Sequence, residues 1–376
     1  MTTQVQTDNL DTLLKELEAL HEKNADFLVP CSLIRIDGNS LQVYKRTGER
    51  VEYTPNSLFH DQLANHLGIP KSYYTRLREN QNTLQHLAPD EDMKITGTPL
   101  YNTVVNTHLA ERGEEMRLLR VQDGVARAFL SEKFNRDLDN YQVALYAARA
   151  MRDMDIPKES VSRCGVTHER LHLQVLAPGL KATINTPRRL GEVIEGGFQL
   201  TNSEVGCGSL DLALYIRVLS CLNGATQTKV VSRRHVGRIL SAGEDGAVYS
   251  DETREAEAKA RLLALRDQIR DLLGGDLFRK FIEKMQGATE HVIPVDKKPL
   301  ADVIELTKKR LSLTDVEGFD VYRNLNMEKD YSLYGLANVV TATARETANA
   351  DRRLELEALG GEMFGWRGRE LAGITH

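Results

Sequence analysis

The segment from His168 to His172 carries the sharpest catalytic pattern in this chain. Its sequence, His-Glu-Arg-Leu-His, satisfies the spacing H-E-x-x-H. On a helix, this spacing places two imidazoles on one face as zinc ligands, with the glutamate beside them as a general base. A zinc-dependent hydrolase that uses His168, Glu169 and His172 is therefore one hypothesis for the function.

The neighbouring residues favour a strand rather than a helix at this position. Gly165 comes shortly before the pattern, and an Ala-Pro-Gly sequence follows at residues 177–179. Between them, Leu171, Leu173 and Val175 alternate with other residues, and a period of two is typical of a strand. No strong candidate for a third zinc ligand follows nearby. We therefore expect a strand with partly exposed histidines and no metal site.

The densest run of positive charge lies within residues 229–238. Its basic members are Lys229, Arg233, Arg234, His235 and Arg238. Lysine and arginine side chains that neutralise phosphates give affinity for nucleic acid without reading its bases. We interpret Lys229, Arg233, Arg234 and Arg238 as nucleic-acid contacts, with a solubilising surface as the alternative.

A helix, a glycine turn and a second helix are predicted over residues 63–77, with Gly68 at the turn. This is the order of a helix-turn-helix, in which Lys71, Ser72 and Arg76 would point towards DNA. Two adjacent tyrosines are bulky for a recognition helix, however. A packing hairpin that does not contact DNA is the preferred interpretation.

Short polar residues and glycines form a motif after a predicted strand in the middle of the chain, and a second short motif follows. Together they comprise Asn202, Ser203, Glu204, Gly206, Asn223 and Gly224. Such side chains cap exposed backbone donors, and glycine permits a close approach of two chains, which favours a structural turn. A ligand or metal site with Glu204 and Asp211 as its carboxylates is the alternative.

This region resembles a known group of proteins. Residues 197–210, with the motif Asn-Ser-Glu-x-Gly, and residues 215–224, which end in Cys-x-Asn-Gly, are similar to the phage/plasmid-like proteins of domain-of-unknown-function family 932. The similarity extends to residues 120–140 and 334–341 and covers roughly residues 55 to 360. Such proteins are encoded on phages, plasmids and bacterial chromosomes, so the resemblance implies a context rather than a reaction.

Both strands and helices are expected in the chain, and these elements must position the motifs. Alternating residues predict a β-meander over 32–53 and a hairpin over 116–130. Further strands are expected near 171–176, 197–200 and 210–222, and the chain after residue 251 reads as helical. The expected fold class is α+β, with a mixed or antiparallel sheet, flanking helices and a helical C-terminal third.

Four regions are expected along the chain. They are an N-terminal amphipathic helix (1–26), a meander with a helical hairpin (27–115), a central mixed-sheet domain (116–245) and a helical C-terminal region (246–376).

The first helix has a leucine stripe after Asp8, the expected N-cap. The stripe consists of Leu10, Leu13, Leu14, Leu17 and Leu20. A lone helix cannot leave such a stripe in water without exposing a sizeable apolar patch. We expect a neighbouring subunit to cover it, and therefore a homo-oligomer.

The composition excludes several classes of protein. Apolar residues make up 41% and charged residues 27% of the chain, which is the balance of an ordinary folded protein. No apolar stretch approaches the ~20 residues of a membrane span, and the first residues do not resemble a secretory signal. We therefore expect no membrane partner and a cytoplasmic location. The net charge of -5 argues against a uniformly basic coat, and no nucleotide-binding fingerprint is present, so no cofactor is expected.

From these patterns we expect a non-enzymatic protein that handles nucleic acid, with binding or annealing of single-stranded DNA as its specific form. The zinc hydrolase and a structural or partner-binding phage protein are the alternatives.

Overall fold

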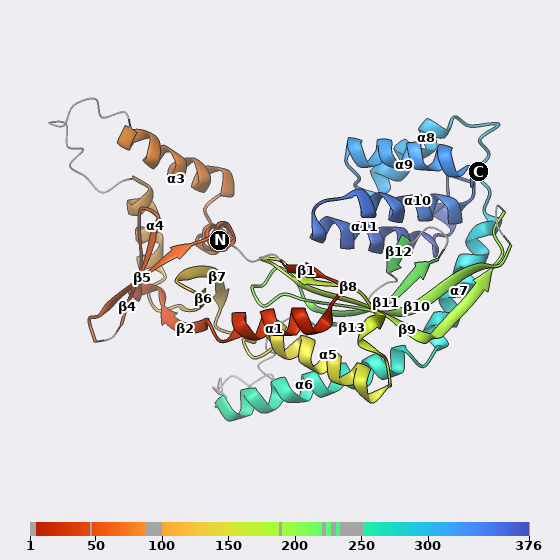
Figure 1. The fold of residues 1–376 in the computed structure, drawn as a ribbon. Helices are drawn as coiled ribbons and strands as arrows, with labels where there is room; N and C mark the ends of the chain where they lie inside the picture. Colours follow the sequence, from red (N-terminus) through yellow and green to blue (C-terminus); the bar gives the residue numbers. More distant parts are fainter. Residues whose placement is uncertain are drawn as a thin grey trace.

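The computed structural model describes residues 5–45, 47–86, 100–187, 190–219, 223–226, 231–233 and 251–375. Figure 1 shows two β-sheets that lie side by side, with helices around both and a concentration of helices in the last third of the chain. The expected α+β class is confirmed.

The N-terminal sheet has six strands in the order β2-β6-β7-β5-β4-β3. Their bounds are β2 (Asn24–Pro30), β3 (Ile34–Asp37), β4 (Ser40–Tyr44), β5 (Arg50–Pro55), β6 (Met116–Gln122) and β7 (Val125–Ser131). β5 pairs with β7 in parallel, and the other neighbours are antiparallel. The predicted hairpin is confirmed as β6–β7, with positive φ at Asp123 and Gly124. This hairpin pairs with β2 on one side and with β5 on the other. The N-terminal sheet therefore extends across residue 115, near which we expected a domain boundary.

Three helices share the core of this sheet: α2 (Ser57–Leu67) and α4 (Leu100–Glu111) contact its strands, and α3 (Lys71–His86) packs against these two helices. The side chain of Asn56 caps α2 by accepting a hydrogen bond from the amide of Phe59 at 2.8 Å. Gly68 ends α2 with a φ of 71°, a left-handed conformation that suits glycine. The predicted helix, turn and helix are confirmed.

The central sheet has seven strands, six of them in the order β1-β8-β9-β10-β11-β12, while β13 pairs with β11. Their bounds are β1 (Val5–Thr7), β8 (Val161–Val166), β9 (Leu171–Ile184), β10 (Glu192–Asn202), β11 (Leu210–Val218), β12 (Asn223–Thr226) and β13 (Val231–Arg233). All of these pairs are antiparallel.

One face of the central sheet is apolar and shares a core with three helices. The cross-strand pair of Val175 and Phe198, with Leu214 opposite Phe198, is fully buried on this face. The helices are α1 (Leu10–His21), α5 (Asn140–Asp153) and α6 (Asp251–Leu272), which lie together on one side of the sheet in Figure 1.

The first helix docks on its own chain. Leu10, Leu13 and Leu17 are buried in the core shared with α5 and β8, and Asn9 rather than Asp8 supplies the cap. This corrects our expectation that a neighbouring subunit covers the leucine stripe.

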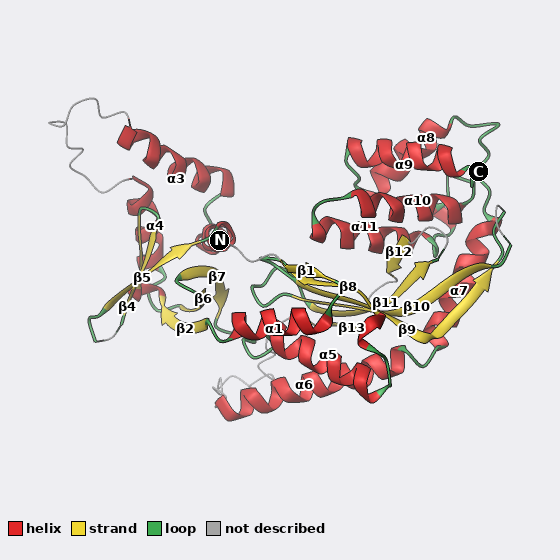
Figure 2. Cartoon of the chain, in the orientation of Figure 1, coloured by secondary structure: helices red, strands yellow, loops and turns green. Residues whose placement is uncertain are grey.

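The remaining helices lie at the other face and the far edge of the central sheet. They are α7 (Asp276–Glu290), α8 (Leu300–Leu311), α9 (Asp315–Glu328), α10 (Leu333–Glu346) and α11 (Ala350–Met363). Short 3-10 turns occur at Cys31–Leu33, Lys158–Ser160 and Gly368–Glu370. Figure 2 shows α10 and α11 beside β12, which they contact. None of the helices in the described part of the chain has the length and apolar character needed to cross a bilayer.

Candidate functional site

The His-Glu-x-x-His pattern is not helical. β8 ends at Val166 and β9 begins at Leu171, so His168 lies in the connecting turn and His172 in the strand. The strand prediction is confirmed. Partial exposure is right for His168 but wrong for His172, which is only 1% exposed. The single helical face that zinc catalysis needs does not form, and no trio of His, Cys, Asp or Glu within the described ranges is placed to hold a metal ion.

The basic segment is described only in part. Lys229, Arg234 and Arg238 lie outside the described residues. Arg233 is the last residue of β13, and its Cα pairs with that of Leu210 at the start of β11. The described part of the segment is thus attached to the central sheet, at the end of β11 that follows the loop 203–209.

The polar motif after β10 connects several parts of the chain. The amide group of Asn202 donates to the carbonyl of Leu138 and to the side chain of Asn140. The Ser203 hydroxyl donates to the carbonyl of Glu169 at 2.7 Å and accepts from the amide of Cys207 at 2.9 Å. These bonds join β10 to α5 and to the β8–β9 turn. They agree with the interpretation of this motif as a structural turn.

Gly206 and Gly224 each lie where a Cβ atom would clash with a neighbouring side chain, but they lie in different parts of the structure. Gly206 has a φ of 81°, and a Cβ there would lie 2.7 Å from the side chain of Leu130. Gly224 pairs with Arg217 near the opposite end of β11, and a Cβ there would lie 2.6 Å from the Tyr215 hydroxyl. Asn223 is the first residue of β12. The structure therefore does not bring Asn223 and Gly224 to the loop that holds Glu204.

Glu204 is the centre of a buried charge cluster that joins the two sheets. Its carboxylate accepts a hydrogen bond from Arg127 Nη1 at 2.7 Å and another from the backbone amide of Asn140 at 3.1 Å. Its carbonyl accepts from Arg120 Nη1 at 2.8 Å. Arg120 also binds both carboxylate oxygens of Asp26, at 3.0 and 3.1 Å. Strands β2, β6 and β7 of the N-terminal sheet are thus tied to a loop of the central sheet.

The electrostatics of this cluster favour an ionised Glu204. Burial alone would raise the pKa of Glu204, but Arg127, Arg120 and the Asn140 amide outweigh it and lower the pKa below its usual value. Burial would likewise lower the pKa of Arg120, and the charges of Glu204 and Asp26 raise it instead. Both charges are therefore retained in the interior because each has its partners.

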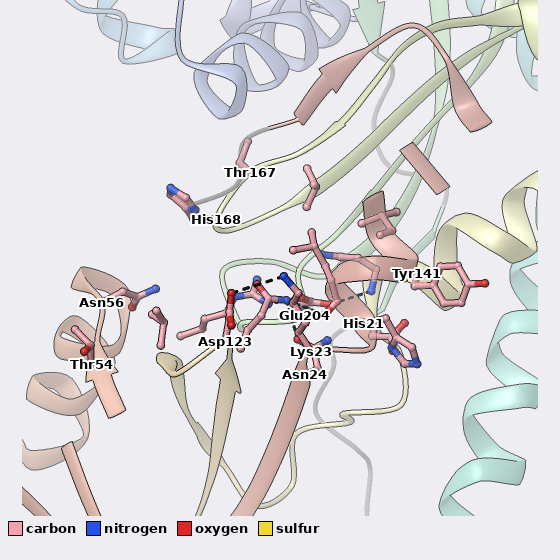
Figure 3. A pocket seen from close by; sticks show the side chains of 18 of the residues that line it. His21, Lys23, Asn24, Thr54, Asn56, Asp123, Tyr141, Thr167, His168 and Glu204 are labelled. Carbon is pink, nitrogen blue, oxygen red and sulfur yellow. Dashed lines mark hydrogen bonds and ion pairs between the residues drawn. The ribbon is translucent and has the colours of Figure 1, made fainter. Parts of the chain in front are cut away.

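A cavity of about 270 Å³ opens beside the cluster, at the junction of the two sheets. In Figure 3, His168 and Thr167 project from the β8–β9 turn on one side, and Asn56, between β5 and α2, lies across from them. Two of the cations that line it are paired within the chain, Arg127 with Glu204 and Lys23 with Asp123 at 3.7 Å, and Asp139 lies 2.6 Å from His21. The described arginine and lysine that line the cavity are therefore already neutralised by carboxylates.

A second buried polar cluster lies on the polar face of the central sheet. Gln174 donates to Gln199 and to Glu357 of α11, both at 2.6 Å, and Arg163 binds the other oxygen of Glu357 at 3.1 Å. Burial raises the pKa of Glu357, and the partly exposed Arg163 and the Gln174 amide only partly offset this. Burial and the nearby charge of Arg163 lower the pKa of His172 to about 4.

Two buried histidines should make the protein acid-labile. Burial also lowers the pKa of His60 in α2 to about 4. The unfolded chain binds a proton at each site near pH 6.5, whereas the native protein does so only near pH 4, so stability is full above pH 6.5 and falls below it. We expect a loss of about 2 kcal/mol per histidine by pH 5.

Urea unfolding of the wild type and of a His60→Gln/His172→Gln variant at pH 7.5 and pH 5 measures this effect. The variant should lose most of the difference between the two pH values. His108→Gln, at a partly exposed position on α4, is the matched control and should keep it. The same pH dependence in the double variant and the wild type would contradict the assignment.

Glu204 could be singled out from the sequence, but its partners could not. Arg120 stands among Leu118, Leu119 and Val121 in a strand, and a charge in an apolar strand is a signal for a buried ion pair. Its partner Asp26 lies 94 positions earlier, a separation that no local pattern reveals. Comparison with known proteins found no matching family model, no matching curated protein and no matching solved structure.

Proposed function

We propose that this chain is a non-enzymatic protein that binds nucleic acid through the basic segment 229–238, with binding or annealing of single strands as its activity. The observation that carries the proposal is the position of β13. Val231 pairs with Leu212 and Arg233 with Leu210, so this strand fixes part of the segment on the central sheet. Ser232, between them, is exposed.

The charge of the segment supports the same proposal. Residues 229–238 contain three arginines, one lysine and one histidine but no acidic residue. This local excess of positive charge in the sequence is of the kind that neutralises the phosphates of a nucleic-acid backbone.

Salt dependence tests this proposal. Each phosphate contact to a single strand contributes a slope of about -0.7 to log K against log salt. The Arg233→Ala/Arg234→Ala variant should therefore have a slope shallower by about 1.4, and it should weaken binding to unrelated sequences equally. Fluorescence anisotropy with single-stranded DNA across several salt concentrations measures both.

The matched control removes the same charge elsewhere. Arg279→Ala/Lys280→Ala changes two exposed cations on α7, and it should leave the slope unchanged. Thermal melts establish that both variants are folded. No binding by the wild type at low salt, or equal slopes for the two variants, would refute the proposal, and the first result would favour a partner-binding protein.

A second candidate mode, reading of duplex DNA, rests on the exposed surface of α3. Tyr74 and Leu77 are buried against the N-terminal core, whereas Lys71, Ser72, Tyr73 and Arg76 are exposed on its first turns. The first turns of a recognition helix are the part that contacts base edges. Lys71, however, forms an ion pair with Asp61 of α2 at 2.6 Å.

The two modes predict different losses. Lys71→Ala/Arg76→Ala should weaken binding to duplex DNA if α3 enters a groove, and should leave single-strand binding intact. The Arg233→Ala/Arg234→Ala variant should show the opposite preference. The same anisotropy series with duplex and single-stranded probes separates them.

A further inference from the structure

A groove runs between helices α1 and α5, which lie beside each other in Figure 1. We call it the α1–α5 groove, and its volume is about 440 Å³. Its floor consists of apolar side chains from both helices and from the turn after α5: Leu10, Leu14, Leu145, Ala148, Met151 and Ile156. Leu14, Leu145 and Ala148 are only half-buried, so part of this apolar floor is in contact with solvent.

Two arginines at the rim of the groove have no acidic partner. Arg149 and Arg152 are exposed, and neither forms an ion pair or a hydrogen bond with a carboxylate in the described part of the chain. The other two ionic side chains of the lining, Asp11 and Lys158, neutralise each other at 2.5 Å. The groove therefore carries two uncompensated positive charges, on a chain whose net charge is -5.

The apolar residues and the arginines of α5 lie on one stripe of the helix. From Leu145 to Arg152, the residues that line the groove follow the spacing i, i+3, i+4, i+7, which places them on a single helical face. The guanidinium carbon of Arg149 also lies 4.9 Å from the centre of the Tyr146 ring, and this cation-π contact holds the charge at the rim. Positive charge is therefore fixed beside an apolar surface about 10 Å long.

We propose that the α1–α5 groove binds an amphipathic helix of a partner protein. The apolar face of that helix enters the groove, and acidic side chains on its flank pair with Arg149 and Arg152. An amphipathic helix in an apolar groove, anchored at the spacing i, i+3, i+4, i+7, is a recurring mode of peptide recognition. The proposal does not depend on the nucleic-acid proposal, because none of residues 229–238 lines the groove.

The walls of the groove favour a helix over an extended strand. The interior backbone groups of α1 and α5 bond within each helix, so the groove offers no sheet edge to which a strand could add. A helical partner satisfies its own backbone hydrogen bonds and needs only side-chain contacts. The apolar floor likewise favours a protein over nucleic acid, because contacts to a phosphate backbone are made by polar and charged groups.

Two synthetic peptides test this chemistry. Both are helical peptides of about 15 residues with leucine at the spacing i, i+3, i+4, i+7, and the flanking residues are glutamate in one and lysine in the other. Fluorescence anisotropy should show that the acidic peptide binds the full-length protein about tenfold more tightly than the basic peptide, because its charges attract the two arginines. An acidic peptide that binds no better than the basic one would overturn the proposal.

The Arg149→Ala/Arg152→Ala variant removes the charges of the rim. It should weaken binding of the acidic peptide about fivefold, as expected for the loss of two exposed ion pairs, and should reduce the preference over the basic peptide. Arg279→Ala/Lys280→Ala removes two exposed cations from α7 and is the matched control, so it should leave the binding of both peptides unchanged. Equal effects of the two double variants would contradict the role of the rim.

The Leu145→Glu variant tests the apolar floor. Leu145 lines the groove but is not part of the hydrophobic core, so this variant should fold, as a thermal melt would establish. It places a carboxylate where the apolar face of the peptide binds, and it should weaken binding of the acidic peptide about tenfold. A folded variant that binds the peptide as tightly as the wild type does would exclude the groove as the binding site.

Two further measurements distinguish other occupants of the groove. Arg149→Ala/Arg152→Ala should keep the affinity of the wild type for single-stranded DNA and its assembly state in sedimentation velocity. If this variant lost as much DNA affinity as Arg233→Ala/Arg234→Ala, the occupant would be nucleic acid. If the wild type formed dimers and this variant did not, the occupant would be a second copy of the chain. Either of these two results would overturn the proposal, and neither depends on the outcome of the nucleic-acid test.

Discussion

Glu204→Ala is expected to destabilise the protein by about 3–5 kcal/mol, because it leaves a buried charge without its partner. Arg127 would lose its carboxylate partner, whereas Arg120 would keep Asp26 and the backbone carbonyl of residue 204 but lose the nearby negative charge. Urea unfolding at pH 7 measures the loss. The same variant should loosen the contact between the two sheets, which hydrogen exchange in β6 and β7 would detect.

Glu357 provides a matched comparison, because it is an equally buried glutamate with the opposite electrostatic balance. Its pKa is raised rather than lowered, and its partner Arg163 is 29% exposed and can be solvated when the carboxylate is removed. Glu357→Gln should therefore change stability at pH 7 by less than about 1 kcal/mol, whereas Glu204→Gln should cost several times more. Equal losses in the two Gln variants would contradict the distinction.

The pH dependence separates the two glutamates further. The folded pKa of Glu204 lies below the unfolded value of 4.5, so the stability that its ionised form contributes is present above pH 4.5 and is lost as the pH falls through the folded pKa. The folded pKa of Glu357 lies above 4.5, so its ionisation lowers stability as the pH rises through that range. Below pH 4.5, Glu204→Gln should thus approach the wild type in stability.

Local patterns in the sequence predicted the elements but not how they assemble. The β6–β7 hairpin was predicted from its Asp-Gly turn, and α2 and α3 from Gly68. The hairpin turn and the helix end at Gly68 are both determined by the backbone conformation and hydrogen bonds of residues that are adjacent in the sequence. The pairing of β5 with β7 was not predicted, because parallel strands are joined by long connections that leave no local signal.

The same contrast between local features and long-range contacts holds for the candidate site. Asn202, Ser203 and Glu204 were recognised as an unusual polar turn, because their types and spacing are local properties. The sequence did not reveal which groups they bind. Glu204 bonds to Arg127 and Asn140, 77 and 64 positions away, and only the meeting of the two sheets brings these residues together.

Gly361→Ala is expected to destabilise the protein by about 3 kcal/mol, at the upper end of the usual cost of overpacking. Gly361 lies in α11 with an ordinary helical backbone, where alanine would otherwise be preferred. A Cβ at this position would lie 1.9 Å from the backbone carbonyl oxygen of Thr226 in β12, and neither backbone can move without disturbing the helix or the sheet. The close approach of α11 to β12 is therefore the reason for glycine here.

Gly287→Ala isolates this effect from helix propensity. Gly287 also lies within a helix, α7, but a Cβ there would have no atom within 4 Å. Alanine should stabilise α7 by about 1 kcal/mol, since it removes the conformational entropy cost of glycine without a steric clash. Urea unfolding of the two variants should thus give shifts of opposite sign. If Gly361→Ala were as stable as Gly287→Ala, α11 and β12 could not be in such close contact, and the packing of the C-terminal helices on the central sheet would have to be different.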